Sequence, residues 1–157
     1  MRLLKHSAGD TIVEVLIAMA VASSVLGGAY VVVNRTMANT RQSQEHTEAL
    51  QIANQQIESI GLLAKSDTPS SLFSDVVTVH CASSVDGSLI EMPGVTALPA
   101  AETAYPTACK GLGTNGFYRT AFIYVKADNN FKVYVNWLGA TGKTTPDEVT
   151  ITYKVYK

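Results

Sequence analysis

The stretch Gly9-Asp10-Thr11-Ile12-Val13-Glu14-Val15-Leu16-Ile17-Ala18-Met19-Ala20-Val21-Ala22 decides the N-terminal fold. It opens a run, residues 12–33, in which nearly every side chain is apolar or small. A helix of this length can cross a hydrocarbon core of roughly 30 Å. One carboxylate, Glu14, lies near the start of the run. Because an unpartnered carboxylate in lipid is costly, we expect Glu14 to have a function.

A short basic leader precedes this run. Arg2 and Lys5 give residues 1–9 the positive charge that holds a leader on the cytoplasmic side of a membrane. The leader is followed by Gly9, a polar junction and an apolar helix, with Glu14 five residues beyond the glycine. This order resembles the N-terminus of type IV pilins and of the pseudopilins of type II secretion. The resemblance covers the first third of the chain.

This resemblance implies a processing site and an assembly residue. In the family a prepilin peptidase cuts after the glycine and methylates the new amine, which implies cleavage between Gly9 and Asp10 and N-methylation of Asp10. The fifth mature residue, here Glu14, pairs with the terminal amine of a neighbouring subunit and sets its register. Asp10 departs from the family, which usually has an aromatic residue or Met there, and its carboxylate would compete with Glu14 for the amine.

Two other interpretations of the N-terminus stay open at this point. The first is an uncleaved signal anchor with Glu14 close enough to the headgroups to stay hydrated. The second, a cleavable Sec signal peptide, fits less well because its cleavage site should follow the apolar core, whereas Gly9 precedes it.

The helix is predicted to continue beyond the apolar run. Residues 34–60 contain no Pro or Gly, and their second half carries an apolar stripe at helical spacing, formed by Leu50, Ala53, Ile57 and Ile60. Gly61 is the predicted C-terminal stop. A helix over residues 11–60 would be roughly 75 Å long. Its first part, 10–33, would lie in membrane or filament core, and its second part, 34–60, would be amphipathic, with an exposed neck before Leu50.

The length and charge of the chain limit the number of domains and the kinds of partner that it can have. A chain of 157 residues fits one modest domain plus an anchor. The formal net charge is −1, and removing a leader that holds Arg2 and Lys5 makes it two units more negative. This balance gives no polyanion-binding signature over the whole chain.

The two cysteines predict a disulfide. Cys81 and Cys109 lie beyond the membrane if the leader is cytoplasmic, and an even pair in an oxidising compartment favours a bridge. Closing a loop of about 29 residues would stabilise the fold by roughly 3–4 kcal/mol. Two free buried thiols remain the alternative in a reducing compartment. The surrounding region, 61–116, is predicted to be irregular, with short strands at 76–81 and 88–92.

The last forty or so residues, 117–157, carry the clearest strand pattern. Apolar and polar side chains alternate over 117–125, 131–137 and 149–155, which predicts an antiparallel meander with one face buried. The residues expected to pack on the helical stripe are Val133, Val135, Trp137, Ile151 and Tyr153. The Val-x-Val-x-Trp strand ending at Trp137 also resembles a strand of some minor pilins and pseudopilins.

Catalytic chemistry finds little support, and we expect no enzyme, cofactor or metal site. His6 lies in the leader and His46 in the neck. His80 is adjacent to Cys81, but neighbouring residues of a strand point to opposite faces, so a thiol–imidazole pair is not expected.

A ligand surface is a secondary prediction. Basic and aromatic side chains on the last strands could grip a DNA strand, although alternating Lys and Tyr are more often a solvated sheet face. The residues in question are Arg119, Lys126, Lys132, Lys143, Lys154 and Lys157 with Tyr118, Tyr134 and Tyr156. Adhesion to a host surface through the loops of 61–116 is the comparable alternative.

The sequence therefore predicts an α+β fold, a long N-terminal helix packed on a small antiparallel sheet. The resemblance implies a pilin-like subunit, more specifically a minor pilin of a type IV pilus used for adhesion, twitching motility or DNA uptake. Its expected partners are the prepilin peptidase, other pilin subunits bound through the N-terminal helix, the assembly platform and the cytoplasmic membrane, before export to an extracellular filament. The alternatives are a type II secretion pseudopilin and a signal-anchored binding domain that does not polymerise.

Overall fold

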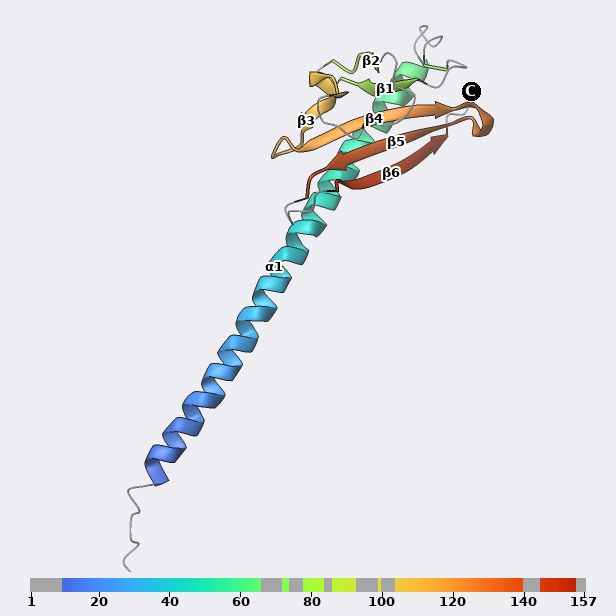
Figure 1. Cartoon of the computed structure of the whole chain (residues 1–157). Helices are drawn as coiled ribbons and strands as arrows, with labels where there is room; N and C mark the ends of the chain where they lie inside the picture. The colour runs from blue at the N-terminus through green and yellow to red at the C-terminus, as the bar shows by residue number, and fades with distance from the viewer. Residues whose placement is uncertain are drawn as a thin grey trace, which may run out of the picture. The chain divides into compact units, whose positions relative to one another are not determined.

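The structure is a computed structural model that describes residues 10–65, 72–73, 78–83, 86–92, 99, 104–139 and 145–154. The chain divides into two compact units, Met1–Arg41 and Gln42–Lys157. One helix, α1 (Asp10–Lys65), forms the described part of the first unit and the beginning of the second (Figure 1). The strands β1 to β6 all belong to the second unit, which we call the head.

The helix prediction is confirmed except at its C-terminal end. α1 ends at Lys65, and Gly61 lies inside it rather than stopping it. Leu63 and Ala64 explain the difference, because both are partly buried against the main core of the head. A glycine inside a helix costs only about 1 kcal/mol, and burial of these two side chains offsets that cost.

The three long strands confirm the predicted meander. β4 (Tyr118–Val125), β5 (Asn130–Trp137) and β6 (Asp147–Lys154) pair antiparallel in sequence order. The turn between the first two contains the 3-10 helix η3 (Lys126–Asp128) followed by Asn129 in the left-handed conformation. Phe122 lies opposite Val133, which lies opposite Ile151, so the residues predicted to share a face do so.

Two of the short strands predicted in the region 61–116 are present, and the structure adds a third that was not predicted. β1 (Val79–Ala82), β2 (Leu89–Met92) and β3 (Lys110–Leu112) lie in it, and η2 (Thr107–Cys109) precedes β3. The sheet order is β2-β1-β4-β5-β6, and β3 also pairs with β4. β1 and β2 overlap the short strands predicted at 76–81 and 88–92, whereas β3, with three residues, is too short for alternation to be visible in the sequence. Of the predicted strand at 76–81, residues 76–77 lie outside the described part.

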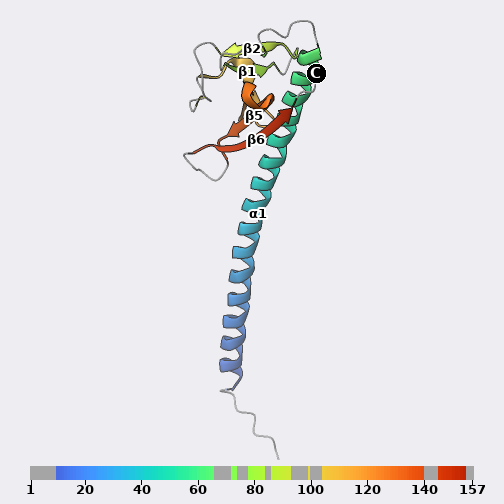
Figure 2. The same cartoon turned by 90° about the vertical axis from the view of Figure 1, so that its right-hand side faces the viewer.

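The main core lies between the head part of α1 and the inner face of the sheet. Figure 2 shows this part of the helix beside β5 and β6. Of the predicted stripe, Ala53 and Ile60 are fully buried, whereas Leu50 and Ile57 are partly buried. The sheet contributes the predicted Val133, Val135, Trp137, Ile151 and Tyr153, together with Tyr118, Phe122, Phe131 and Val149.

The expectation that the meander has one buried face is wrong at β4, beside which β1 lies. The opposite face of these strands carries a second core, formed by Val79, Cys81, Met92, Tyr105, Cys109 and Ala121. Ala121 is fully buried there. The segment that contains Tyr105 and Cys109 covers this face. The alternation of residues within β4 does not show that another segment of the chain packs on its second face.

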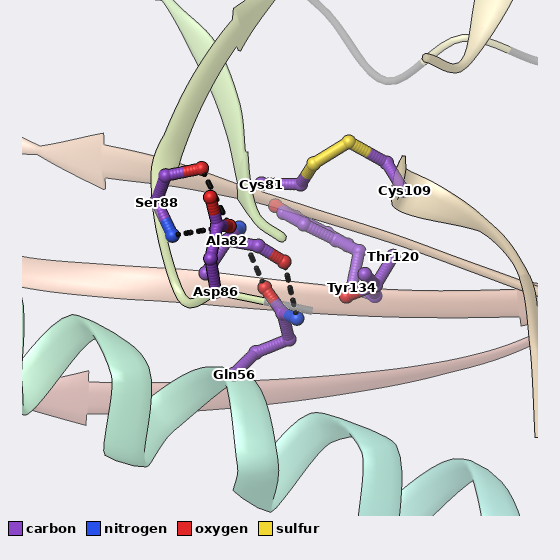
Figure 3. Close-up of a disulfide and its surroundings, with 8 residues drawn as sticks. All are labelled: Gln56, Cys81, Ala82, Asp86, Ser88, Cys109, Thr120 and Tyr134. Carbon is purple, nitrogen blue, oxygen red and sulfur yellow. Dashed lines mark hydrogen bonds between the residues drawn. A yellow bond between two sulfur atoms is a disulfide. The ribbon is translucent and has the colours of Figure 1, made fainter. Parts of the chain in front are cut away.

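A glutamine on α1 bonds the helix directly to the sheet. The Gln56 side-chain amide donates to the Ala82 carbonyl (3.0 Å), and the Ala82 N–H donates to Gln56 Oε1 (2.9 Å), as Figure 3 shows. β1 pairs with β4 only at Val79 and His80. Gln56 therefore replaces the missing strand partner at Ala82, and a buried glutamine satisfies two buried backbone groups.

Replacing Gln56 with Leu should destabilise the head by about 2–4 kcal/mol, because both backbone groups of Ala82 would lose their partner inside the protein. The neighbouring exposed Gln55 offers a matched control. Gln55→Leu should change the free energy of unfolding by no more than about 0.5 kcal/mol. Thermal or urea unfolding followed by the fluorescence of Trp137, the one tryptophan of the chain, measures both. Equal effects of the two substitutions would contradict this role of Gln56.

Candidate assembly segment and the disulfide region

The first candidate site is the N-terminal part of α1. Every side chain described between residues 12 and 44 is exposed, including the large apolar ones. Among them are Ile12, Leu16, Ile17, Val21, Leu26, Tyr30 and Val32, each more than half exposed. In water such a surface is unfavourable by about 25 cal/mol per Å² of apolar area. An exposed apolar surface of this extent indicates a lipid or protein environment.

This part of the chain is long and apolar enough to cross a membrane. Its two serine hydroxyls are satisfied within the helix, because Ser23 donates to the Met19 carbonyl (2.7 Å) and Ser24 to the Val21 carbonyl (2.8 Å). Such bonds remove the cost of placing a hydroxyl donor in hydrocarbon. Gly27 and Gly28 have no neighbouring atoms within 4 Å where a Cβ would stand, so this point of the helix is open to close approach.

The three predicted N-terminal site residues fare differently. Gly9 lies outside the described residues, and Asp10 is described only as the first residue of α1. Cleavage between them and methylation of Asp10 therefore remain predictions. Glu14 is exposed on the helix, the one charged residue within the apolar run of residues 12–33.

The predicted disulfide is present. Cys81 in β1 and Cys109 at the end of η2 are bridged, with their Cα atoms 6.0 Å apart (Figure 3). Both cysteines are fully buried in the second core. The bridge therefore fastens the segment containing Tyr105 onto the sheet, where it covers Ala121. The alternative of two free thiols is excluded in this structure.

His80 and Cys81 face opposite sides of β1, as expected. The His80 ring stacks on Phe122 with centroids 5.8 Å apart, on the side of the main core. Burial lowers the pKa of the imidazole below its ordinary value of 6.5, while Glu91 across the strand pair and the Thr78 backbone oppose that shift. His80 is therefore a neutral packing residue near neutral pH.

This lowered pKa predicts a pH-dependent stability. Below about pH 6.5 the unfolded chain takes up a proton that folded His80 resists, so the free energy of unfolding should fall as the pH drops towards the folded pKa. His80→Gln should flatten that slope between about pH 6.5 and pH 5. His46→Gln, at an exposed position of α1, should leave it unchanged. Urea unfolding at a series of pH values tests this, and an unaltered slope in His80→Gln would contradict it.

A polar cluster at the start of the head was not foreseen from the sequence. The Trp137 indole donates to Glu45 Oε2 (3.2 Å), and the Tyr118 hydroxyl donates to the Glu45 carbonyl (3.1 Å). The Thr114 N–H donates to Glu48 and lowers the pKa of that carboxyl. Burial and the nearby Glu48 carboxylate raise the pKa of Tyr118. Glu45 and Glu48 thus hold the sheet and the turn after β3 against α1.

Gly113 makes the approach of that turn to the sheet achievable. It has φ +78°, and a Cβ there would stand 2.7 Å from Tyr118 Cε2 and 2.9 Å from Glu48 Oε1. Only glycine fits both the left-handed backbone and this space. The sequence signal was present as a glycine in a turn, but its contact with a helix residue far away in the chain was not visible.

Only some of the basic and aromatic side chains predicted to form a DNA-binding surface are exposed in the structure. Arg119 is only 5% exposed, and Tyr118 is buried in the main core. Lys132 and Tyr134 are partly exposed, and Lys126 and Lys154 are exposed. Lys143, Tyr156 and Lys157 lie outside the described residues. The described remainder is three side chains on the sheet and Lys126 in the turn after β4, which is a weak footprint for DNA.

Within the described residues, no group of three His, Cys, Asp or Glu side chains is placed to hold a metal ion. Comparison of the chain with protein-family models, with curated proteins and with solved structures gives no match. The exposed apolar helix and the architecture of the head therefore carry the functional argument.

Proposed function

We propose that this chain is a structural subunit, more specifically a minor subunit, of a type IV pilus. The observation that carries the proposal is the apolar part of α1, which presents large aliphatic side chains on all sides and which the rest of the described chain leaves exposed. A membrane anchor and a subunit of a helix-packed filament both need such a surface. The Gly9–Glu14 stretch supports the filament subunit, because a plain anchor gains nothing from a carboxylate in its apolar run.

In this proposal the protein first crosses the cytoplasmic membrane once, with the leader inside and the head outside. A prepilin peptidase removes residues 1–9, and the assembly platform transfers the mature chain from lipid into the filament. The apolar helix exchanges lipid contacts for contacts with neighbouring helices, so its hydrophobic surface is buried in both states. Glu14 pairs with the terminal amine of a neighbour, and this pair specifies the stagger of the subunits more than it adds stability.

The head supports this role through its construction. Its disulfide and its two cores give a rigid body that tolerates an extracellular environment. A contact with a host surface or DNA would form at the loops of the head, because binding residues are disproportionately carried by loops.

Recovery of the protein from surface filaments tests the proposal. Cells carrying the chain are sheared, and the released filaments are separated from the membranes. We expect the chain in the sheared fraction, and we expect its removal from that fraction when the assembly ATPase is absent. A chain found only in membranes, with the ATPase present and active, would instead favour the signal-anchored binding domain.

A pseudopilin of type II secretion would share the same N-terminal chemistry. Secretion and pilus assembly are separated by the partner genes, because a secretion system brings a secretin and no retraction ATPase. Loss of secretion without loss of filaments on deletion of this gene would favour the pseudopilin.

A further inference from the structure

The N-terminal part of the chain carries few charges, and all of them lie near its start. In residues 1–33 the charged side chains are Arg2, Lys5, Asp10 and Glu14. Both carboxylates belong to the first turns of α1, ahead of an apolar stretch that carries no further charge. Glu14 is exposed and forms no ion pair within the described residues, so the helix itself does not neutralise it.

Cleavage after Gly9 would change the charge of this end of the chain. While the leader is present, Arg2 and Lys5 balance Asp10 and Glu14. Once the leader is removed, the two carboxylates remain with one new amine, so the mature end has a net charge of −1. Methylation of the amine would keep its positive charge. With a neutral residue in place of Asp10, the amine and Glu14 would cancel, so Asp10 decides the sign.

The charge of this end has a consequence because the mature end crosses the bilayer during assembly. In the proposed function, α1 leaves the membrane on the side of the head, so the mature N-terminus moves outward across a hydrocarbon core of roughly 30 Å. The potential across an energised cytoplasmic membrane is negative inside. It therefore pulls a negative charge outward and opposes the outward movement of a positive one. Arg35 and Arg41 follow the apolar run and are already on the outer side, so they do not cross.

We propose that the membrane potential helps to extract the mature chain from the cytoplasmic membrane by acting on the carboxylate of Asp10. The inference rests on the proposed filament subunit and names an energy source for its assembly. Removal of the leader also acts as the switch. The potential exerts no net force on the balanced side chains of the uncleaved end, but it pulls the negative mature end outward.

The size of the effect is set by one elementary charge. Moving one charge across about 100 mV changes an equilibrium roughly 40-fold, which corresponds to about 2.3 kcal/mol. Replacing Asp10 with a neutral residue changes the charge of the mature end by one unit in either protonation state of Glu14. The comparison between these two chains therefore isolates the contribution of Asp10.

Competition between two versions of the full chain in the same cells tests this. The cells make the wild type and Asp10→Asn, distinguished by a tag, and a potassium ionophore with graded external potassium sets the potential. The ratio of wild type to variant in sheared filaments is divided by the same ratio among cleaved chains in membranes. Both chains use the same platform and ATPase, so changes in energy supply and in cleavage cancel. We expect this quotient to fall as the potential is collapsed, by up to roughly 40-fold for about 100 mV.

Three further variants separate the charge of residue 10 from its identity. Asp10→Glu keeps the charge and should match the wild type at every potential. Asp10→Asn combined with Thr11→Asp moves the carboxylate by one residue and should restore the dependence on potential. Asp10→Lys should reverse it, so that the share of this variant in filaments rises as the potential is collapsed. A quotient that stays constant at all potentials, or a dependence that does not follow the charge, would overturn the proposal.

The two proposals fail in distinguishable ways. Wild type present in sheared filaments with a constant quotient leaves the filament subunit standing and removes the role of the potential. Absence of both chains from sheared filaments, with the assembly ATPase active, removes the filament subunit and the extraction step with it.

Discussion

Glu14→Ala should leave the protein in the membrane and reduce its amount in sheared filaments roughly tenfold or more, because a charged amine would then enter an apolar assembly without its partner. Removing the carboxylate makes the helix more apolar, so insertion itself should not suffer. The ratio of filament to membrane protein, measured by immunoblot of the two fractions, gives the effect.

Two variants separate the charge of Glu14 from its size. Glu14→Asp keeps the carboxylate and should retain most of the incorporation. Ser24→Ala removes a polar group that is already satisfied by the Val21 carbonyl, so it should behave as wild type. Normal incorporation of Glu14→Ala would show that the carboxylate sets no register.

Replacing Cys81 and Cys109 together with Ala should lower the free energy of unfolding of the head by about 3–4 kcal/mol. The bridge closes a sequence separation of 28 residues, and it holds the segment that covers Ala121. For a domain of this size, such a loss corresponds to a fall in Tm of about 10–20 °C. Trp137 fluorescence and far-ultraviolet circular dichroism of the full-length protein in detergent report the transition.

Measurements of Tm in reductant distinguish the loss of the disulfide from the loss of side-chain packing. Wild type kept in reductant while folded should retain its Tm, since both sulfur atoms are buried, whereas wild type refolded in reductant should match the double variant. A double variant with an unchanged Tm would contradict a stabilising role of the bridge.

The parts of the fold predicted from the sequence are those with a long periodic signal. The apolar run and the absence of proline before Pro69 predict α1, and alternation over eight-residue strands predicts β4 to β6. Gly61 was misleading because a local stop signal was outweighed by packing of Leu63 and Ala64. β1 and β2 overlap the short strands predicted at 76–81 and 88–92, whereas β3 has three residues, which is too short for a period to appear.

The residues of the candidate site also differ in whether the sequence reveals them. Glu14 stands out because it interrupts an apolar run, and the disulfide was predicted because the chain has an even number of cysteines. Glu45, Glu48 and Gln56 lie in a segment rich in polar residues and look solvated, yet their partners come from the sheet and its turns. Their role depends on contacts between distant parts of the chain, which a single sequence does not display.

The N-terminal sequence and intact mass of the protein from membranes and from sheared filaments test the central claim most directly. The account predicts a chain in the filament fraction that begins at Asp10, and the mass shows directly whether its amine carries a methyl group. A chain that still begins at Met1 and occurs only in membranes would contradict the account and identify a signal anchor.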